Sequence, residues 1–235
     1  MATETPLRRP GPLADRGPGA SEALAALLVW ILVDRSVGPA YSRLAYPNPH
    51  LGDALFYARV GLLRLAETAL FLLYWRIRGW RLKDLGLLGP RARAGWRVGA
   101  SWALTCAALV IVLEGIFRVG LGMSFLGAVT RMHFRGRELV SLVVAGGIFG
   151  PIFEELLFRG ILYGGLRKRL GAVPATVVVA VIFAAAHGAF RRIYAVQTAG
   201  GILFCAAYEV SGSLWAPLLI HISGNLAIFL APLLL

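Results

Sequence analysis

Two acidic residues and an arginine interrupt an apolar stretch in the second half of the chain. The stretch reads GIFGPIFEELLFRGILYGG and contains Glu154, Glu155 and Arg159. A charged side chain costs about 2.5–3.5 kcal/mol at the centre of a membrane helix, so charges there indicate a function. At about 100° per residue, Glu155 and Arg159 share a helix face and can pair, which offsets both charges. Glu154 lies about 100° away and has no partner on its own helix.

Two histidines and an asparagine lie in two further apolar stretches. His187 ends the run VVVAVIFAAAHGAF. His221 and Asn225 lie four positions apart in WAPLLIHISGNLAIFL, on one helix face. The remaining histidines, His50 and His133, fall in predicted loops, where a surface position explains them. The unusual polar residues therefore come from three different predicted helices.

The spacing along the chain places two of these residues at similar depth. Glu154 lies 13 residues before Arg167, and His187 lies 15 residues after Ala172, on either side of a basic turn. At about 1.5 Å per residue, both are roughly 20 Å from that turn. Pro151 predicts a kink one turn before Glu154, which opens space there.

These residue types can hydrolyse an amide bond in two ways. In the first, Glu154 is a general base toward water, and a neutral His187 shares that water or relays its proton. His221 and Asn225 then donate hydrogen bonds to the oxyanion. In the second, Glu154, His187 and His221 hold a zinc ion, because two histidines and one carboxylate form a known catalytic zinc set. The sequence leaves both mechanisms open.

Each residue also has a structural explanation. The two glutamates and Arg159 could form an ion network, and a membrane asparagine often joins helices by hydrogen bonds. Ser223, in ISGN, is explained as a small packing residue between His221 and Asn225 rather than as a nucleophile. The sequence contains no HExxH motif of a zinc protease and no GxGD motif of an aspartyl protease.

The composition predicts that membrane helices position these residues. Of the 235 residues, 58% are hydrophobic and 15% charged, and the mean hydropathy is +0.71. A soluble domain has about 45–50% apolar and 25% charged residues, so this class is excluded. The formal net charge of +12 comes mainly from arginines between apolar runs. That pattern is typical of charges flanking membrane spans and not of nucleic-acid binding.

Seven apolar runs predict an all-α, polytopic transmembrane bundle of about seven helices, with the active site in its C-terminal half. The runs cover residues 21–44, 53–75, 98–118, 139–166, 172–190, 194–210 and 214–235. Spans near 20 residues fit a bilayer core of about 30 Å and must be helical in lipid. We divide the chain into a flexible tail (1–19), N-terminal transmembrane helices with basic loops (20–138) and catalytic helices (139–235). Loop charge favours a cytoplasmic N-terminus.

Three motifs in this order resemble those of a known family. EELLFR matches EExxxR, FAAAH matches FxxxH, and HISGN matches HxxxN. On separate membrane helices they resemble the CPBP (CAAX protease and bacteriocin-processing) family of intramembrane proteases, the Rce1-like or glutamic-type enzymes, over about residues 139–235. The resemblance implies that Glu154 and His187 activate water and that His221 and Asn225 stabilise the oxyanion. Glu155 and Arg159 would then support or orient these groups.

The resemblance also implies a function and a location. Such enzymes cleave peptide bonds near the ends of membrane-associated proteins or peptides. The known substrate classes of the family are prenylated proteins, bacteriocin-like peptides and C-terminal sorting signals. The expected partners are membrane lipid and a membrane-anchored substrate, with no nucleic acid. The expected cofactor is none, or one zinc ion. Arginine and alanine richness indicates a prokaryotic plasma membrane. The alternative is a non-catalytic membrane scaffold, immunity protein or small transporter, because buried charges also mark transport pathways.

Overall fold

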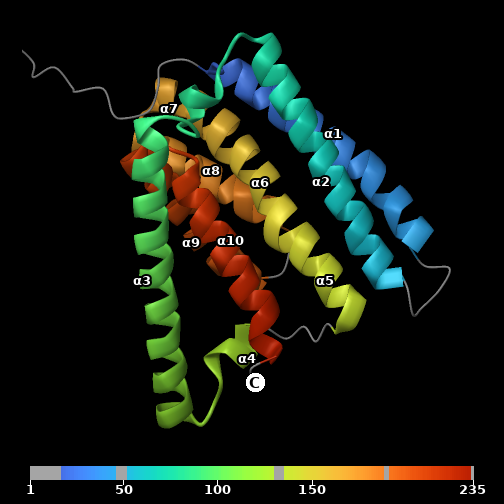
Figure 1. Cartoon of the computed structure of the whole chain (residues 1–235), viewed down its shortest axis with the longest axis vertical. Helices are drawn as coiled ribbons and strands as arrows, with labels where there is room; N and C mark the ends of the chain where they lie inside the picture. The colour runs from blue at the N-terminus through green and yellow to red at the C-terminus, as the bar shows by residue number, and fades with distance from the viewer. Residues whose placement is uncertain (1–16, 46–51, 130–134, 188–190, 234–235) are drawn as a thin grey trace, which may run out of the picture.

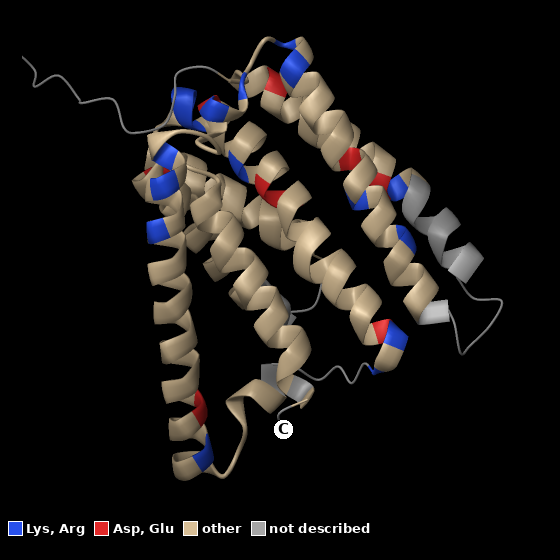
Figure 2. Ribbon diagram, viewed as in Figure 1, with Lys and Arg blue, Asp and Glu red and all other residues tan. Residues whose placement is uncertain are grey.

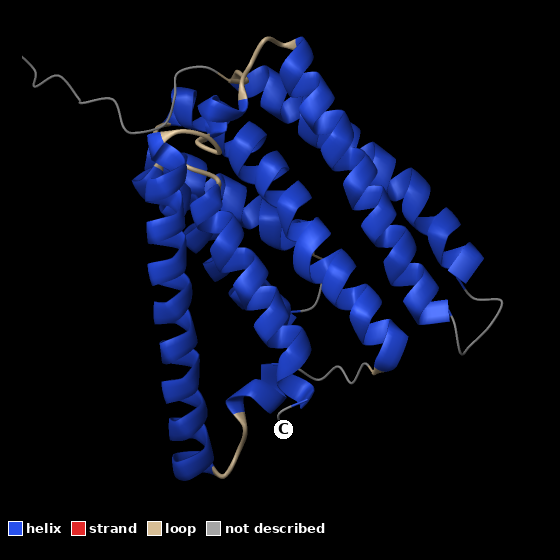
Figure 3. Ribbon diagram, viewed as in Figure 1, coloured by secondary structure: helices blue, strands red, loops and turns tan. Residues whose placement is uncertain are grey.

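The computed structural model describes residues 17–45, 52–129, 135–187 and 191–233. Within these ranges the chain is helical and contains no strand (Figure 3). The predicted all-α membrane bundle is therefore confirmed. Its helices satisfy their backbone hydrogen bonds internally, as a chain in lipid requires.

Seven long helical rods make up the described chain. Six are single helices: α1 (Ala20–Ala45), α2 (Gly52–Ile77), α3 (Pro90–Leu121), α8 (Ala172–Ala186), α9 (Arg191–Ser211) and α10 (Trp215–Leu230). The seventh rod runs without a break through α5 (Gly136–Val144), the π-helical segment η2 (Ala145–Phe149), α6 (Gly150–Glu155), the π-helical segment η3 (Leu156–Tyr163) and α7 (Gly164–Leu170). Three short helices complete the list: η1 (Leu82–Leu85), α4 (Phe125–Val129) and η4 (Ala231–Leu233).

The central rod lies between two outer groups of helices. Figure 1 shows the hairpin α1–α2 on one side of the rod and α3 on the opposite side, next to α10. Helices α8 and α9 pack against each other as a second hairpin, and α9 also contacts α10 and η3. The buried core is built mainly from η3, α8, α9 and α10. The rod that carries the glutamates is thus covered on both sides.

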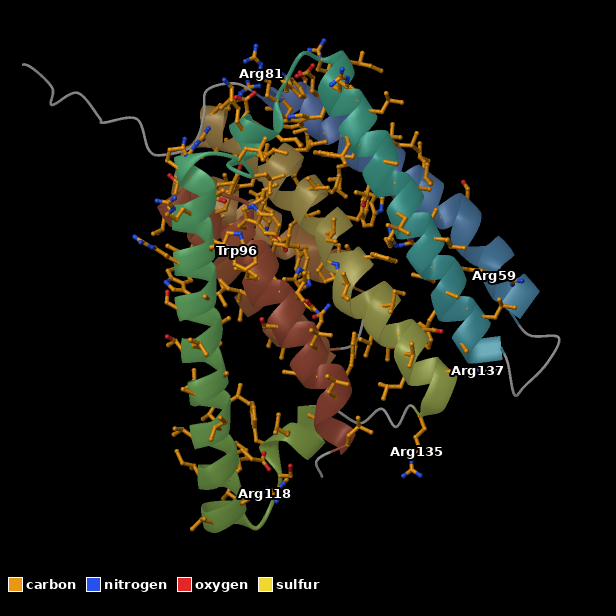
Figure 4. The ribbon with its side chains drawn as sticks, in the orientation of Figure 1. Arg59, Arg81, Trp96, Arg118, Arg135 and Arg137 are labelled. Atoms are coloured by element: carbon orange, nitrogen blue, oxygen red, sulfur yellow. The ribbon has the colours of Figure 1, made fainter. Side chains whose placement is uncertain are left out.

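Two described segments are long and apolar enough to cross a membrane by length and composition. They are Leu82–Leu121, which includes α3, and Gly136–Leu170, the central rod. The shorter helices α8 and α10 are also apolar. Charged residues are concentrated toward the ends of the bundle, and a few lie at mid-length of its helices (Figure 2). Arg81 lies near one end, whereas Arg118, Arg135 and Arg137 lie near the other (Figure 4).

Some predicted boundaries are wrong. The fifth run was expected to continue to Phe190, but α8 ends at Ala186 and residues 188–190 lie outside the described chain. The third helix begins at Pro90 rather than at residue 98, because proline at the first position suits a helix start. The proposed tail, residues 1–19, lies almost wholly outside the described chain, as do His50 and His133.

The structure also changes the local geometry predicted around Pro151. Instead of a simple kink, a π-helical segment precedes α6, and the N–H of Gly150 bonds to the carbonyl of Ala145, five residues back. Pro151 lacks an N–H, so it cannot continue the regular four-residue pattern at this point. π-Helical segments of this kind occur often at functional sites.

Candidate active site

Three of the predicted residues converge on one carboxylate oxygen. The Oε2 atom of Glu154 lies 3.5 Å from Nε2 of His187 and 3.7 Å from Nε2 of His221. The three side chains come from α6, the end of α8 and α10. Glu154 and His187 are 20% and 25% exposed, whereas His221 is almost fully buried. The group is therefore open on the side of Glu154 and His187.

His187 is held by the end of the helix that carries it. It is the residue that follows α8, with φ −87° and ψ 7°, and its Nδ1 lies 2.8 Å from the carbonyl oxygen of Phe183. A carbonyl oxygen can only accept a hydrogen bond, so Nδ1 carries the hydrogen. The Nε2 atom of a neutral His187 is then an acceptor, and it faces Glu154.

His221 is held by the second glutamate. Its Nδ1 lies 2.7 Å from Oε1 of Glu155, and the same oxygen lies 3.0 Å from Nη1 of Arg159. Glu155 and Arg159 are 1% and 0% exposed, so the predicted pair is a fully buried ion pair. The ionised carboxylate accepts from Nδ1, which leaves Nε2 of a neutral His221 as a second acceptor facing Glu154.

The convergence of acceptors has a chemical consequence. An ionised Glu154 and two neutral imidazoles present three acceptor atoms to one another with no hydrogen between them. The Oε2 atom of Glu154 is buried and has no hydrogen-bond donor in the described structure. A shared proton, a bound water that donates to two of these atoms, or a bound cation would balance the group. Water activation and metal binding both have such a starting point.

The fit of a metal ion to these residues is mixed. Each histidine donates its Nδ1 hydrogen to an oxygen, as metal-binding histidines usually do. However, no group of three or more His, Cys, Asp or Glu side chains among the described residues is arranged to hold a metal ion. The zinc site of Glu154, His187 and His221 therefore stays a prediction.

An aromatic enclosure surrounds Arg159. Its guanidinium carbon lies 4.7 Å from the ring centroid of Phe183 and 4.9 Å from that of Phe204, and Nη2 donates to the carbonyl of Gly201. The Phe204 ring also stacks on His221, with centroids 4.6 Å apart. Sequence reasoning missed Phe204 and Gly201, because α9 carries no polar residue in a motif to draw attention to them.

Asn225 is placed differently from the other predicted residues. Its Nδ2 donates to the carbonyl of Gly146 on the central rod, at 2.8 Å. This bond fixes the amide one turn beyond His221 and uses one of its two hydrogens. The second hydrogen is left to bind another acceptor. The structure thus brings Glu154, His187 and His221 together and holds Asn225 against the same rod at Gly146, one helical turn of α10 from His221.

Comparisons with known proteins point to one family. A family model described as "Type II CAAX prenyl endopeptidase Rce1-like" matches residues 136–227, a range that contains all six predicted site residues. The chain is 26% identical over 191 residues to the "Membrane-embedded CAAX protease MroQ" of Staphylococcus aureus (strain USA300), an alignment that covers 77% of this chain and 75% of the relative.

A second relative matches a shorter region. The "Putative membrane peptidase YdiL" of Bacillus subtilis (strain 168) is 30% identical over 84 residues, which is 36% of this chain and 34% of that protein. No solved structure matches. With the three motifs carried on separate helices of a membrane bundle, the match of residues 136–227 to the Rce1-like family model and the similarity to these two relatives support a membrane protease of the CPBP family.

Proposed function

We propose that the protein is an intramembrane endopeptidase that uses Glu154 to activate water. The observation that carries this proposal is the convergence of His187 and His221 on one oxygen of Glu154, at 3.5 and 3.7 Å. The match of residues 136–227 to the Rce1-like endopeptidase model makes peptide-bond hydrolysis the reaction to expect. The substrate is a membrane-associated protein or peptide, cut near one of its ends.

Water attacks from the open side of the group. Glu154 and His187 are the partly exposed members, so a water molecule can bind beside them, within reach of both side chains, while the peptide approaches. The carboxylate of Glu154 takes a proton as the water oxygen bonds to the carbonyl carbon. When the C–N bond breaks, the same proton passes to the departing nitrogen, which leaves Glu154 ionised again.

His221 and Asn225 stabilise the negative charge on the carbonyl oxygen. His221 donates from Nε2 when it is an imidazolium, and the Glu155 carboxylate at its Nδ1 stabilises that form. Asn225 supplies the amide hydrogen that is not bonded to Gly146. Arg159 neutralises Glu155 and keeps its carboxylate fixed. These donors are positioned before the substrate binds, which is where most of such stabilisation originates.

A zinc ion is the alternative source of activated water. Glu154, His187 and His221 would hold it, and it would lower the pKa of a bound water and polarise the substrate carbonyl. The residues above would keep their roles in binding the substrate and the oxyanion. The location proposed is a prokaryotic plasma membrane with the N-terminus in the cytoplasm, supported by basic residues near the end of the bundle where α1 begins.

The test compares wild-type protein with Glu154→Gln, which removes the base and changes the side-chain shape little. Each protein is expressed in cells, and new peptide termini in the membrane fraction are quantified by mass spectrometry. We expect termini that depend on the wild-type protein and disappear with Glu154→Gln. The peptide identified in this way is then tested with purified enzyme in liposomes.

Glu114→Gln is the matched control. Glu114 of α3 accepts hydrogen bonds from Ser124 and from the backbone N–H of Leu126, so its described role is to join α4 to α3. It should cleave like wild type. If Glu154→Gln produces the same termini as wild type, the hydrolase proposal fails. The chain would then be a non-catalytic scaffold, immunity protein or transporter.

A further inference from the structure

A second cluster of charges lies between the two N-terminal helices, outside the region that matches the family. Arg64 of α2 donates from Nη1 to Glu67 (2.6 Å) and from Nη2 to Asp34 of α1 (2.8 Å). Arg64 and Glu67 are 16% and 8% exposed. Arg64 lies 13 residues before the end of α2, and Glu154 lies 16 residues before the end of α7. Both are thus about 20–24 Å from the same end of the bundle (Figure 1).

Arg64 reaches the residue that precedes the proposed base. Its guanidinium carbon lies 5.3 Å from the ring centroid of Phe153, within the range of a cation–π contact. Phe153 is buried, and Trp30 of α1 packs on it, with ring centroids 6.3 Å apart. Both N-terminal helices therefore contact α6 at the position next to the base.

The backbone of the central rod explains why α6 needs outside support. Helix α6 has six residues and lies between the π-helical segments η2 and η3. A π-helical turn adds a residue, so it rotates the side chains that follow relative to a regular helix. The direction of Glu154 thus depends on side-chain contacts with neighbouring helices. Glu155 supplies these contacts toward α10, and Phe153 supplies them toward α1 and α2.

Helix α2 also approaches the rod closely beside Arg64. A Cβ atom at Gly61 would lie 3.1 Å from the Cβ of Ala145 and 3.5 Å from the ring of Phe149, both in η2. Gly61 and Arg64 are three residues apart and share a helix face. One face of α2 thus packs along the central rod. Gly61 on that face contacts η2, and Arg64 contacts α6 through Phe153.

We propose that Arg64, held by Asp34 and Glu67, is a positioning residue for Glu154. It fixes Phe153, and with it the rotation of α6, so that the carboxylate of Glu154 faces both histidines. The N-terminal hairpin is therefore part of the working enzyme and not only a membrane anchor. This inference rests on the proposed hydrolysis.

The experiment separates positioning from folding by removing the whole charge cluster. Arg64→Met alone leaves two carboxylates unpaired, so the main variant is the triple change Asp34→Asn, Arg64→Met and Glu67→Gln. Steady-state kinetics are measured in liposomes with the membrane peptide identified by terminal proteomics. We expect kcat to fall about 10- to 100-fold with KM unchanged, because small misplacements of a catalytic group have effects of that size. Arg64→Lys, which keeps the charge over the ring, should retain most of the activity.

A second variant tests the contact without touching the charges. Phe153→Leu removes the ring, and the control Phe71→Leu removes a similarly buried ring of α2 that stacks on Trp75. Both should lower the melting temperature, but only Phe153→Leu should lower kcat. The inference is overturned if the triple variant keeps wild-type kcat, if KM changes instead of kcat, or if the two phenylalanine variants have equal kcat.

A readout without substrate keeps this test independent of the proposed function. Amide hydrogen exchange is measured on wild type and the triple variant in nanodiscs. We expect faster exchange in residues 150–155 and unchanged exchange in α8. If wild type cleaves no peptide, the proposed hydrolysis fails, and the exchange rates still decide whether Arg64 holds α6. Equal exchange in residues 150–155 would overturn the role of Arg64.

Discussion

Removing Arg159 should expose how strongly the site depends on its buried ion pair. Arg159 is 0% exposed and its partner Glu155 is 1% exposed. The change Arg159→Met removes the guanidinium, keeps an unbranched apolar side chain about as long as the alkyl part of arginine, and leaves the Glu155 carboxylate buried with His221 beside it. Loss of one partner of a buried pair costs roughly 3–5 kcal/mol, because an uncompensated charge remains.

The magnitude converts into a measurable shift. For a chain of 150–250 residues, 1 kcal/mol lowers the melting temperature by roughly 2–4 °C, so Arg159→Met should melt about 6–20 °C lower. The assay is the change in tryptophan fluorescence on heating the purified protein in detergent, since the chain has six tryptophans. Activity should be lost as well, because Arg159 no longer holds in place the Glu155 carboxylate that positions His221.

The double variant Glu155→Gln with Arg159→Met is the control that identifies the cause. Glutamine removes the buried charge and still accepts from Nδ1 of His221 through its Oε1. The double variant should therefore melt at a higher temperature than Arg159→Met alone, although it has lost more native groups. If Arg159→Met melts like wild type, or if the double variant is no more stable than the single one, the reasoning about a buried charge is wrong.

Three further predictions concern packing, the oxyanion and metal content. Gly201→Ala should lower the free energy of unfolding by about 1–3 kcal/mol, the usual cost of overpacking, because the new Cβ would lie 2.8 Å from the Cα of Ala180. Gly115→Ala is the control: nothing lies within 4 Å of its new Cβ, so it should be neutral or stabilising in the same melting assay. Asn225→Ala should lower kcat about 10²–10³-fold if the amide binds the oxyanion, and a loss of less than about tenfold in the peptide assay would assign it a packing role. If Glu154 acts without metal, elemental analysis of the purified wild-type protein should show less than one zinc ion per chain. One zinc ion per chain, together with activity that is lost on chelation and restored by zinc, would establish the zinc-dependent mechanism.

The sequence predicted the membrane fold and most of the site for identifiable physical reasons. Apolar runs near 20 residues must be helices in lipid, so the seven rods follow from composition and length. Charges that are costly in an apolar stretch drew attention to Glu154, Glu155 and Arg159, and the distance from a shared turn placed His187 at a similar depth. The buried pair at 3.0 Å and the convergence on Glu154 confirm this geometry.

Other features depend on three-dimensional contacts that a single sequence does not encode locally. Glu155 was expected to pair with Arg159, and its second bond, to His221, arises only because α10 packs against α6. The π-helical segments around α6 leave no mark in the apolar pattern. Nothing in the sequence distinguishes Phe204 from other aromatic residues of a membrane helix. The structure shows that its ring contacts both Arg159 and His221.

The most direct test of the proposed mechanism is a cryo-electron microscopy structure of the wild-type protein in a lipid nanodisc, at a resolution that shows bound water. We expect Nε2 of both His187 and His221 to face the Glu154 carboxylate, at separations close to 3.5 and 3.7 Å. We also expect a water molecule within hydrogen-bond reach of Glu154 and His187. A structure with His187 turned toward lipid, or more than about 10 Å from Glu154, a loose multiple of hydrogen-bond reach, would contradict the proposed mechanism.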